Sequence, residues 1–238
     1  MDSALRGGRT AVVASLGVVI ALAWAYLAAM AGHGMAGMHT AGMLFLMWVL
    51  MMVAMMLPSA LPMVLIFDRF NRARGDAAAF STALFTAGYL LVWTGFSALA
   101  TALQWALQGS GLLSADMALT GTSIVAAAFI AAGAWQFAPL KRSCLDACRA
   151  PIAFLSAHWR EGRRGALLMG LHHGAYCLGC CWLLMALLFV GGVMNLLWIV
   201  PIALFVLLEK VLPGGGRMGK VGGALLIAWG AGALFMAA

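Results

Sequence analysis

Long apolar stretches, separated by short polar connections, run along nearly the whole chain. A helix that crosses a hydrocarbon core of about 30 Å needs about 20 residues, most of them apolar. Seven stretches approach or exceed this length, and they lie near 11–31, 41–66, 78–107, 118–139, 166–190, 194–211 and 221–238. The pattern therefore predicts an all-α fold, a polytopic membrane helix bundle of about seven transmembrane helices that forms a single transmembrane domain over residues 1–238.

The composition favours lipid as the surrounding medium. Of the 238 residues, 65% are hydrophobic and only 9% are charged, whereas soluble domains are about 45–50% apolar and about 25% charged. The formal net charge of +7 would suggest a nucleic-acid partner in a soluble protein. Here the Lys and Arg residues lie only in the short connections, so we expect the lipid bilayer, and no nucleic acid, as a partner.

The same basic residues predict an orientation. When the apolar stretches are threaded in order, all 14 Lys and Arg residues fall on one side of the membrane, and the positive-inside rule makes that side the cytoplasm. We therefore expect an N-in, C-out, multi-pass protein of a bacterial inner (cytoplasmic) membrane. The segment Ala29-Met30-Ala31 resembles a signal-peptide cleavage site, but the apolar run before it is longer than usual, which favours an uncleaved first helix.

Several function classes lack support in the sequence. The chain contains no G-x-x-x-x-G-K-[ST] motif, so ATP-driven pumping by this chain alone is not expected. We find no convincing internal repeat of the kind that builds secondary transporters. We expect a transporter or a metal-binding protein rather than an enzyme.

Methionine is concentrated in the second stretch and in the connection before it, where ten of the chain's 17 methionines lie between Met30 and Met63. Four recur at every fourth position and share one helix face, namely Met43, Met47, Met51 and Met55. Outside the membrane the connection adds four candidate donors, namely His33, Met35, Met38 and His39. Because thioether sulfur favours Cu(I), this spacing indicates a ladder of copper ligands. Methionine is also an ordinary apolar filler, and we assign that packing role to Met52, Met56 and Met63.

The fifth stretch carries the segment HHGAYCLGCC, from His172 to Cys181. Polar groups inside a membrane span are costly and by default indicate function. At about 3.6 residues per turn, one helix face would hold His173, Tyr176, Cys177 and Cys180, with His172 and Cys181 beside it. Cys177 would lie about 16 Å into the bilayer from the cytoplasmic side. We predict an intramembrane metal site here, completed by the methionine ladder if the second and fifth helices touch.

Two weaker candidates lie near the cytoplasmic side. Cys144 and Cys148 would share one helix face and could relay a soft metal, although two reduced surface thiols are the more ordinary interpretation. Glu209 and Lys210 end the sixth stretch, where an interfacial charge pair is ordinary. Glu209, like Tyr176, could instead support a ligand or accept a proton.

Three segments together resemble a known family: HHGAYCLGCC, the methionine-rich MWVLMMVAMMLPSALPM from Met47 to Met63, and EKVLPGG from Glu209 to Gly215. With them the chain resembles the bacterial family described as predicted metal-binding integral membrane proteins, over most of its length. The resemblance implies metal binding within a membrane but no established reaction and no particular metal. The four-residue methionine spacing also resembles the thioether rungs of eukaryotic copper importers, in ligand chemistry and not in fold.

The leading hypothesis is a protein that handles Cu(I) for uptake, transfer or homeostasis. The outer His and Met residues would collect the ion, the ladder would pass it inward, and His173, Cys177 and Cys180 would hold it near the midplane. Donors that strengthen inward, from thioether to thiolate, favour uptake or transfer to a periplasmic or membrane metalloprotein.

Two alternatives stay open. One is a thiol-disulfide or electron-transfer protein in which Cys177 and Cys180 cycle, with haem or quinone as a less favoured cofactor. The other is a structural or assembly subunit of a membrane complex, whose polar residues only join helices. A homo-oligomer is compatible with every one of these hypotheses.

Overall fold

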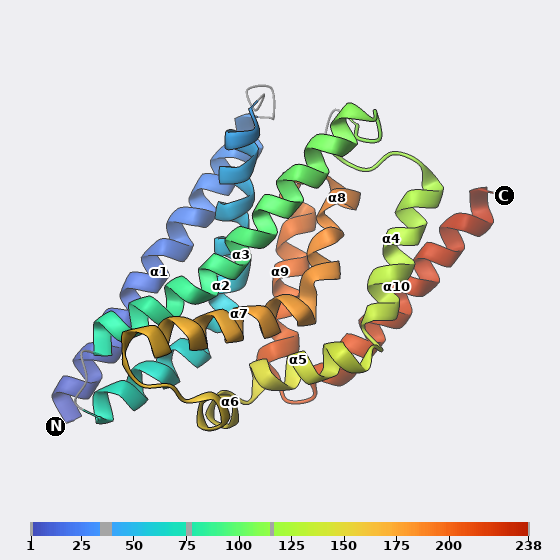
Figure 1. The fold of residues 1–238 in the computed structure, drawn as a ribbon. Helices are drawn as coiled ribbons and strands as arrows, with labels where there is room; N and C mark the ends of the chain where they lie inside the picture. The colour runs from blue at the N-terminus through green and yellow to red at the C-terminus, as the bar shows by residue number, and fades with distance from the viewer. Residues whose placement is uncertain (1, 34–39, 75–77, 115–116, 238) are drawn as a thin grey trace.

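The computed structural model describes residues 2–33, 40–74, 78–114 and 117–237, and within these ranges the chain is almost entirely helical (Figure 1). The elements in chain order are α1 (Asp2–His33), α2 (Ala41–Ala73), α3 (Ala78–Gly109), α4 (Thr122–Trp135), α5 (Pro139–Arg149), α6 (Pro151–His158), α7 (Gly162–Ala186), α8 (Leu188–Gly191), α9 (Leu196–Val211) and α10 (Gly215–Ala237). An isolated β-bridge joins Leu113 to Leu119 between α3 and α4. The all-α fold class is confirmed.

Several helices are long and apolar enough to cross a membrane. Among the described residues these are α1, α2, α3, α7 extended through α8, and α10, which makes 5 candidate spans, or up to 6 if α4 and α5 together count as one. The seven spans expected from hydropathy are therefore not confirmed. The difference lies in α4 and α9, which have 14 and 16 residues. At about 1.5 Å per residue they reach only roughly 21 and 24 Å, less than a hydrocarbon core of about 30 Å.

The apolar stretch 118–139 is divided in the structure. Helix α4 begins only at Thr122, after Gly121 adopts a φ of 97° that favours glycine. Pro139 then starts α5 at the N-terminal position that tolerates proline, and the axes of α4 and α5 differ by 62°. The stretch therefore corresponds to α4, and the chain changes direction where the stretch ends at Pro139.

The basic connection from Lys141 to Arg164 is mostly helical rather than a loop. It forms α5 and α6, each of which has proline in its first turn. Helix α5 is amphipathic and packs on α7, with Lys141, Cys144 and Leu145 buried. This packing carries the cysteines of the connection to the interior of the bundle.

Glycine allows two helix pairs to approach closely. On α3 and α7, a Cβ atom added to Gly88 would lie 2.9 Å from the backbone nitrogen of Leu171, and one on Gly170 would lie 2.8 Å from the carbonyl carbon of Phe85. On α4 and α10, a Cβ on Gly133 would lie 2.6 Å from the carbonyl oxygen of Gly223. Small residues at such contacts let helix backbones pack tightly in lipid, where van der Waals contact drives association.

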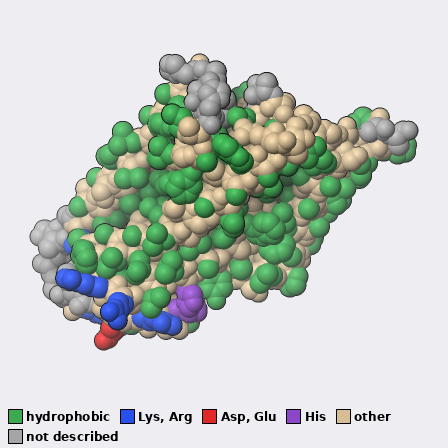
Figure 2. All heavy atoms as spheres, turned by 45° about the horizontal axis from the view of Figure 1, so that its top comes forward, with side chains coloured by type: hydrophobic (Ala, Val, Ile, Leu, Met, Phe, Trp, Pro, Cys, Tyr) green, Lys and Arg blue, Asp and Glu red, His purple; other side chains and the backbone are tan. Residues whose placement is uncertain are grey.

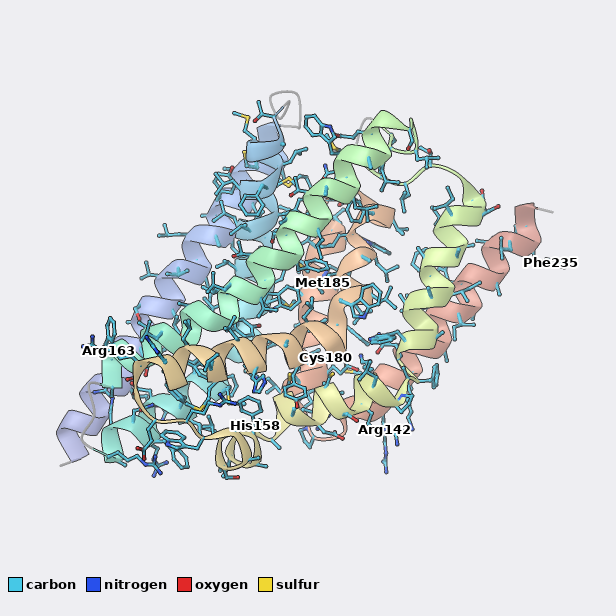
Figure 3. All side chains as sticks on the ribbon, viewed as in Figure 1. Arg142, His158, Arg163, Cys180, Met185 and Phe235 are labelled. Atoms are coloured by element: carbon cyan, nitrogen blue, oxygen red, sulfur yellow. The ribbon has the colours of Figure 1, made fainter. Side chains whose placement is uncertain are left out.

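Charged side chains gather at one end of the molecule. In the face shown by Figure 2, the visible Lys and Arg side chains lie at the lower end and hydrophobic side chains cover most of the remaining surface. Figure 3 places Arg142, His158 and Arg163 at this end and Phe235 near the opposite one. We call the end that carries Arg142 and Arg163 the basic end.

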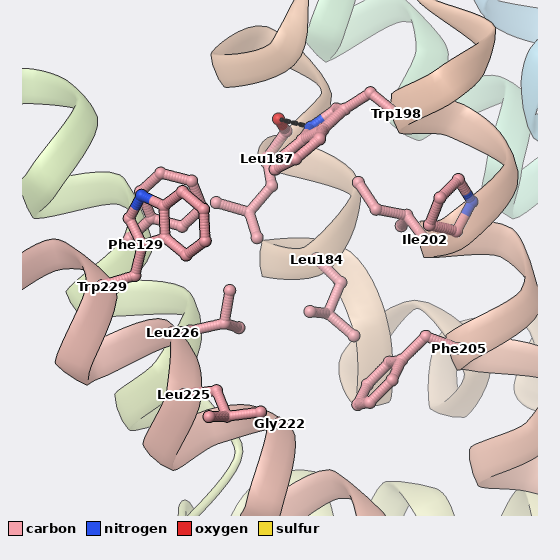
Figure 4. A pocket seen from close by; sticks show the side chains of 11 residues that line it. Phe129, Leu184, Leu187, Trp198, Ile202, Phe205, Gly222, Leu225, Leu226 and Trp229 are labelled. Atoms are coloured by element: carbon pink, nitrogen blue, oxygen red, sulfur yellow. Dashed lines mark hydrogen bonds between the residues drawn. The ribbon is translucent and has the colours of Figure 1, made fainter.

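An apolar pocket separates the α4–α10 pair from α7 and α9 (Figure 4). Its volume is about 350 Å³. The residues that line it are Phe129, Leu184, Leu187, Trp198, Pro201, Ile202, Phe205, Gly222, Leu225, Leu226 and Trp229. The indole nitrogen of Trp198 donates to the carbonyl oxygen of Leu187 at 2.7 Å, so that polar group is satisfied at the pocket wall.

Candidate metal site

Sulfur atoms from three helices meet inside the bundle. Helix α7 contributes Cys177, Cys180 and Cys181, each at most 1% exposed. Cys148, from α5, is half-buried and packs against the cluster of buried residues that contains these three cysteines. From α2, the Sδ atom of Met56 lies 3.9 Å from Sγ of Cys181. We call these five residues the sulfur cluster.

The helical repeat of α7 explains why its three cysteines face the same way. Cys177, Cys180 and Cys181 are three and four residues apart, which is the spacing of neighbours on one helix face. The thiols of Cys180 and Cys181 donate to the carbonyl oxygen of Cys177 at 3.0 and 3.1 Å. These bonds satisfy two buried thiols, and Figure 3 shows Cys180 in the part of α7 that leads to α8.

Two polar side chains from other helices approach Cys177. The hydroxyl of Tyr89, on α3, lies 3.1 Å from Sγ of Cys177 and donates to the carbonyl oxygen of Met56 at 3.0 Å. The ammonium of Lys210, on α9, donates to Sγ of Cys177 at 2.9 Å and to Oγ of Ser59 at 3.0 Å. A positive charge beside this sulfur stabilises negative charge there, and the thiolate is the form that binds metals.

The neighbouring residue Glu209 has a different partner. Its carboxylate accepts two hydrogen bonds from the ammonium of Lys141, at 2.7 and 2.8 Å, and both side chains are at most 2% exposed. Lys141 also donates to Oε1 of Gln136, and Arg149 donates to the backbone oxygen of Glu209 at 3.2 Å. Glu209 and Lys210 therefore do not form the interfacial pair expected at the end of α9, because the packing of α5 against this end excludes water.

The two adjacent histidines occupy different surroundings. His173 is buried among aromatic rings, with its ring centre 5.6 Å from that of Tyr89 and 6.0 Å from that of Phe85. Within the described part of the chain, its Nδ1 atom has no hydrogen-bond partner. His172 is exposed, and its ring lies 5.5 Å from that of His158. The structure thus separates His172 from the buried face that holds His173.

The methionine ladder lies mostly inside the bundle. Met47, Met51 and Met55 are at most 1% exposed, whereas Met43 is 52% exposed. The three buried members belong to the same packed cluster as Cys177. Of the outer candidates, His33 ends α1, but its side chain lies outside what the structure describes, as do Met35, Met38 and His39.

The cysteines of α5 are not surface thiols. Cys144 is buried, with its sulfur 2.7 Å from where a Cβ on Gly179 would lie, and Cys148 is half-buried. Both pack against the cluster that contains the cysteines of α7, and Cys144 lies close enough to Cys180 for an electrostatic interaction. Tyr176 lies beside His158, with ring centres 6.2 Å apart, rather than in contact with these sulfurs.

Sequence reasoning missed three participants, namely Met56, Tyr89 and Lys210. Met56 was assigned to packing because it lies off the ladder face, yet it is the methionine that contacts Cys181. Tyr89 and Lys210 are polar residues in apolar stretches, and that burial cost was the available signal. Their partners could not be read from the sequence, because Cys177 is 88 residues from Tyr89 and 33 from Lys210.

The sulfur cluster offers the donor atoms of a soft-metal site, but its side chains are not arranged around a single ion. Across the described residues, no three His, Cys, Asp or Glu side chains are grouped closely enough to hold an ion. Thiol and thioether sulfur are nevertheless the donors that Cu(I) selects. Cu(I) binding here would need rotation of the cysteine side chains from the carbonyl of Cys177 toward a shared centre.

Comparisons with known proteins agree with this chemistry. A family model described as "Copper chaperone" (PpoB2) matches residues 45–233, which include every helix of the sulfur cluster. Searches of curated proteins and of solved structures each found no match. The family match therefore supports copper handling.

Proposed function

The chain belongs to the copper chaperone family, and we propose that it binds Cu(I) within a membrane helix bundle and passes the ion to a protein partner. One observation carries this proposal, namely the sulfur cluster to which α2, α5 and α7 contribute, buried except for the half-buried Cys148. Thiolate and thioether ligands select Cu(I) over the harder ions that prefer oxygen or nitrogen.

Charge balance favours a monovalent ion at this cluster. Cu(I) bound by two thiolates forms a complex with one net negative charge. Lys210 supplies one positive charge 2.9 Å from Cys177, and a buried charge is costly unless it is paired. A divalent ion with the same two thiolates would be neutral and would leave the ammonium of Lys210 without a counter-charge.

The methionine ladder supports a route toward the cluster. Met43 is exposed and the next three members are buried along α2, which carries Met56 of the sulfur cluster. We propose that thioethers pass Cu(I) from the outer surface to the stronger thiolate donors. In this proposal the bundle crosses a bacterial inner membrane with its N-terminus inside, α4 and α9 complete seven crossings, and a periplasmic or membrane metalloprotein receives the ion.

The copper content of purified protein tests the proposal. The protein is expressed with added copper, purified in detergent and kept reduced. We expect about one copper per chain or more in the wild type, and about one equivalent less in the double variant Cys177→Ser/Cys180→Ser. The matched control is Cys144→Ser, a buried cysteine of α5 outside the sulfur cluster, which should keep its copper. Equal copper in the double variant, or none in any reduced sample, would contradict the proposal.

The apolar pocket favours a second candidate function. Leu184 and Leu187 line it one to two turns beyond Cys180 on the same helix, so an isoprenoid or acyl chain could lie near the cysteines. A thiol-disulfide protein that uses a quinone would fit such a pocket. Mass spectrometry of protein purified without reductant tests this candidate: a bond between Cys177 and Cys180, with a co-purifying quinone, would favour it, and free thiols with no quinone would exclude it.

A further inference from the structure

Two histidines face each other at the basic end, apart from the sulfur cluster. His158 ends α6, and His172 lies two turns into α7 from Arg164, on the exposed face of that helix. Their ring centres are 5.5 Å apart and the ring planes are 83° apart. Figure 3 shows His158 at the lower end of the molecule, below α7. His158 is half-buried and His172 is exposed on the surface of the bundle.

The backbone prepares one of these rings for metal binding. Nδ1 of His158 lies 3.1 Å from the carbonyl oxygen of Phe154. Because a carbonyl only accepts, Nδ1 is the donor in this bond, and Nε2 keeps its lone pair. The ring of Phe154 stacks on that of His158 with centres 4.8 Å apart, which fixes the imidazole plane. Histidines that bind metals commonly donate their other ring nitrogen to a carbonyl in this way.

The separation of the rings suits one shared ion. A metal–nitrogen bond is about 2 Å long, so two imidazoles in line on one ion have ring centres roughly 6 Å apart, and less when the bonds are bent. The observed 5.5 Å lies within that range. A shared ion would require the exposed His172 side chain to turn its free ring nitrogen toward His158.

Helix α7 connects this pair to the sulfur cluster. His172, Tyr176 and Cys180 are four residues apart in turn, and successive positions rotate by about 40° from the exposed side of α7, at His172, to the buried side, at Cys180. Cys177 is five residues beyond His172, a rise of about 7.5 Å. An ion held at the histidines would thus lie close to the buried sulfurs and would also be accessible from outside the bundle.

We propose that His158 and His172 form a second, two-imidazole copper site, through which the ion exchanges between the sulfur cluster and the surface at the basic end. The choice of copper rests on the proposed function, whereas the site itself rests on the two rings. Imidazole binds copper readily but less selectively than thiolate. The site is therefore suited to release and capture of the ion rather than to storage.

The test is a titration of reduced, detergent-purified protein with Cu(I) against a competing chelator. Every sample carries His33→Ala and His39→Ala, because these outer imidazoles could bind copper themselves. The compared variants are His158→Gln/His172→Gln, the exposed single change His172→Gln, and Cys177→Ser/Cys180→Ser. X-ray absorption at the copper edge identifies nitrogen or sulfur donors in each loaded sample.

We expect the parent protein to bind a second, weaker copper that His158→Gln/His172→Gln loses and that His172→Gln weakens at least about tenfold. The cysteine variant should retain this ion with nitrogen donors only. The same second copper in the parent and in His158→Gln/His172→Gln would overturn the proposal. A parent protein that binds only the nitrogen-bound ion would contradict the proposed sulfur site while supporting the histidine site. The two failures can therefore be distinguished.

Discussion

The ammonium nitrogen of Lys210 lies 2.9 Å from Sγ of Cys177, and both side chains are buried. The two residues belong to different helices, α9 and α7, and Ser59 of α2 accepts the second hydrogen bond from the same ammonium. A lysine rarely lies at membrane depth without a charge or ligand to pair with. This contact joins three helices at the place where the cysteines converge. Lys210 therefore contributes both to helix packing and to the charge beside the sulfur cluster.

Replacement of Lys210 by methionine should weaken copper binding. Without the ammonium, a Cu(I) complex of two thiolates would be a buried net negative charge with no counter-charge. We expect the affinity for Cu(I), measured against a chelator, to fall at least tenfold, which corresponds to about 1.4 kcal/mol. Lys220→Met, on the exposed face of α10, is the matched control and should leave affinity unchanged. Equal affinities in both variants would contradict a role for Lys210.

The thioether of Met56 provides a finer test of the cluster. Met56→Leu keeps the volume and removes the sulfur that lies 3.9 Å from Cys181. Such a swap costs less than about 1.5 kcal/mol in folding free energy, so a larger loss of copper affinity would report lost ligation. Met63→Leu, buried in a different packed cluster, should bind copper normally. A Met56→Leu protein with unchanged affinity would exclude Met56 as a ligand.

The buried pair of Lys141 and Glu209 should contribute to stability rather than to copper binding. Glu209→Gln removes one charge and leaves the other buried, which costs about 3–5 kcal/mol when a buried pair is broken. We expect a lower free energy of unfolding in detergent for this variant. The double change Lys141→Met/Glu209→Leu should recover much of the loss, because it removes both charges. A Glu209→Gln protein as stable as the wild type would contradict this assignment.

Glycine at the α3–α7 contact should be irreplaceable. A Cβ atom at Gly170 would lie 2.8 Å from the carbonyl carbon of Phe85, which cannot move without shifting α3. Gly170→Ala should therefore lower thermal stability, even though alanine at an open helix position is favoured over glycine by roughly 0.5–1 kcal/mol. The control is Gly95→Ala on α3, where nothing lies within 4 Å of the new Cβ. Thermal unfolding that ranked the two variants equally would show that close approach does not matter here.

Hydropathy could predict the long helices because each must supply its own apolar surface to lipid. The stretches near 41–66, 78–107 and 166–190 correspond to α2, α3 and α7 in the structure. The division of 118–139 could not be predicted in the same way. A hydropathy window averages over residues and does not detect the 62° change of direction before Pro139.

The candidate site was partly predictable because residue spacing within one helix is recorded in the sequence. The spacing of Cys177, Cys180 and Cys181 determines that they share a face of one helix, and the sequence contains that information. The approach of Cys148, Met56 and Lys210 is a property of tertiary packing. Met56 and Cys181 are 125 residues apart in the chain, and no local pattern records that contact.

The most direct test of a sulfur-bound copper is X-ray absorption at the copper edge of reduced protein that carries one equivalent of copper or less. We expect a Cu(I) edge and sulfur scatterers in the wild type and in Cys144→Ser, with the sulfur contribution lost in Cys177→Ser/Cys180→Ser. A wild-type spectrum with only nitrogen or oxygen donors, unchanged in the double variant, would contradict the sulfur cluster as the copper site.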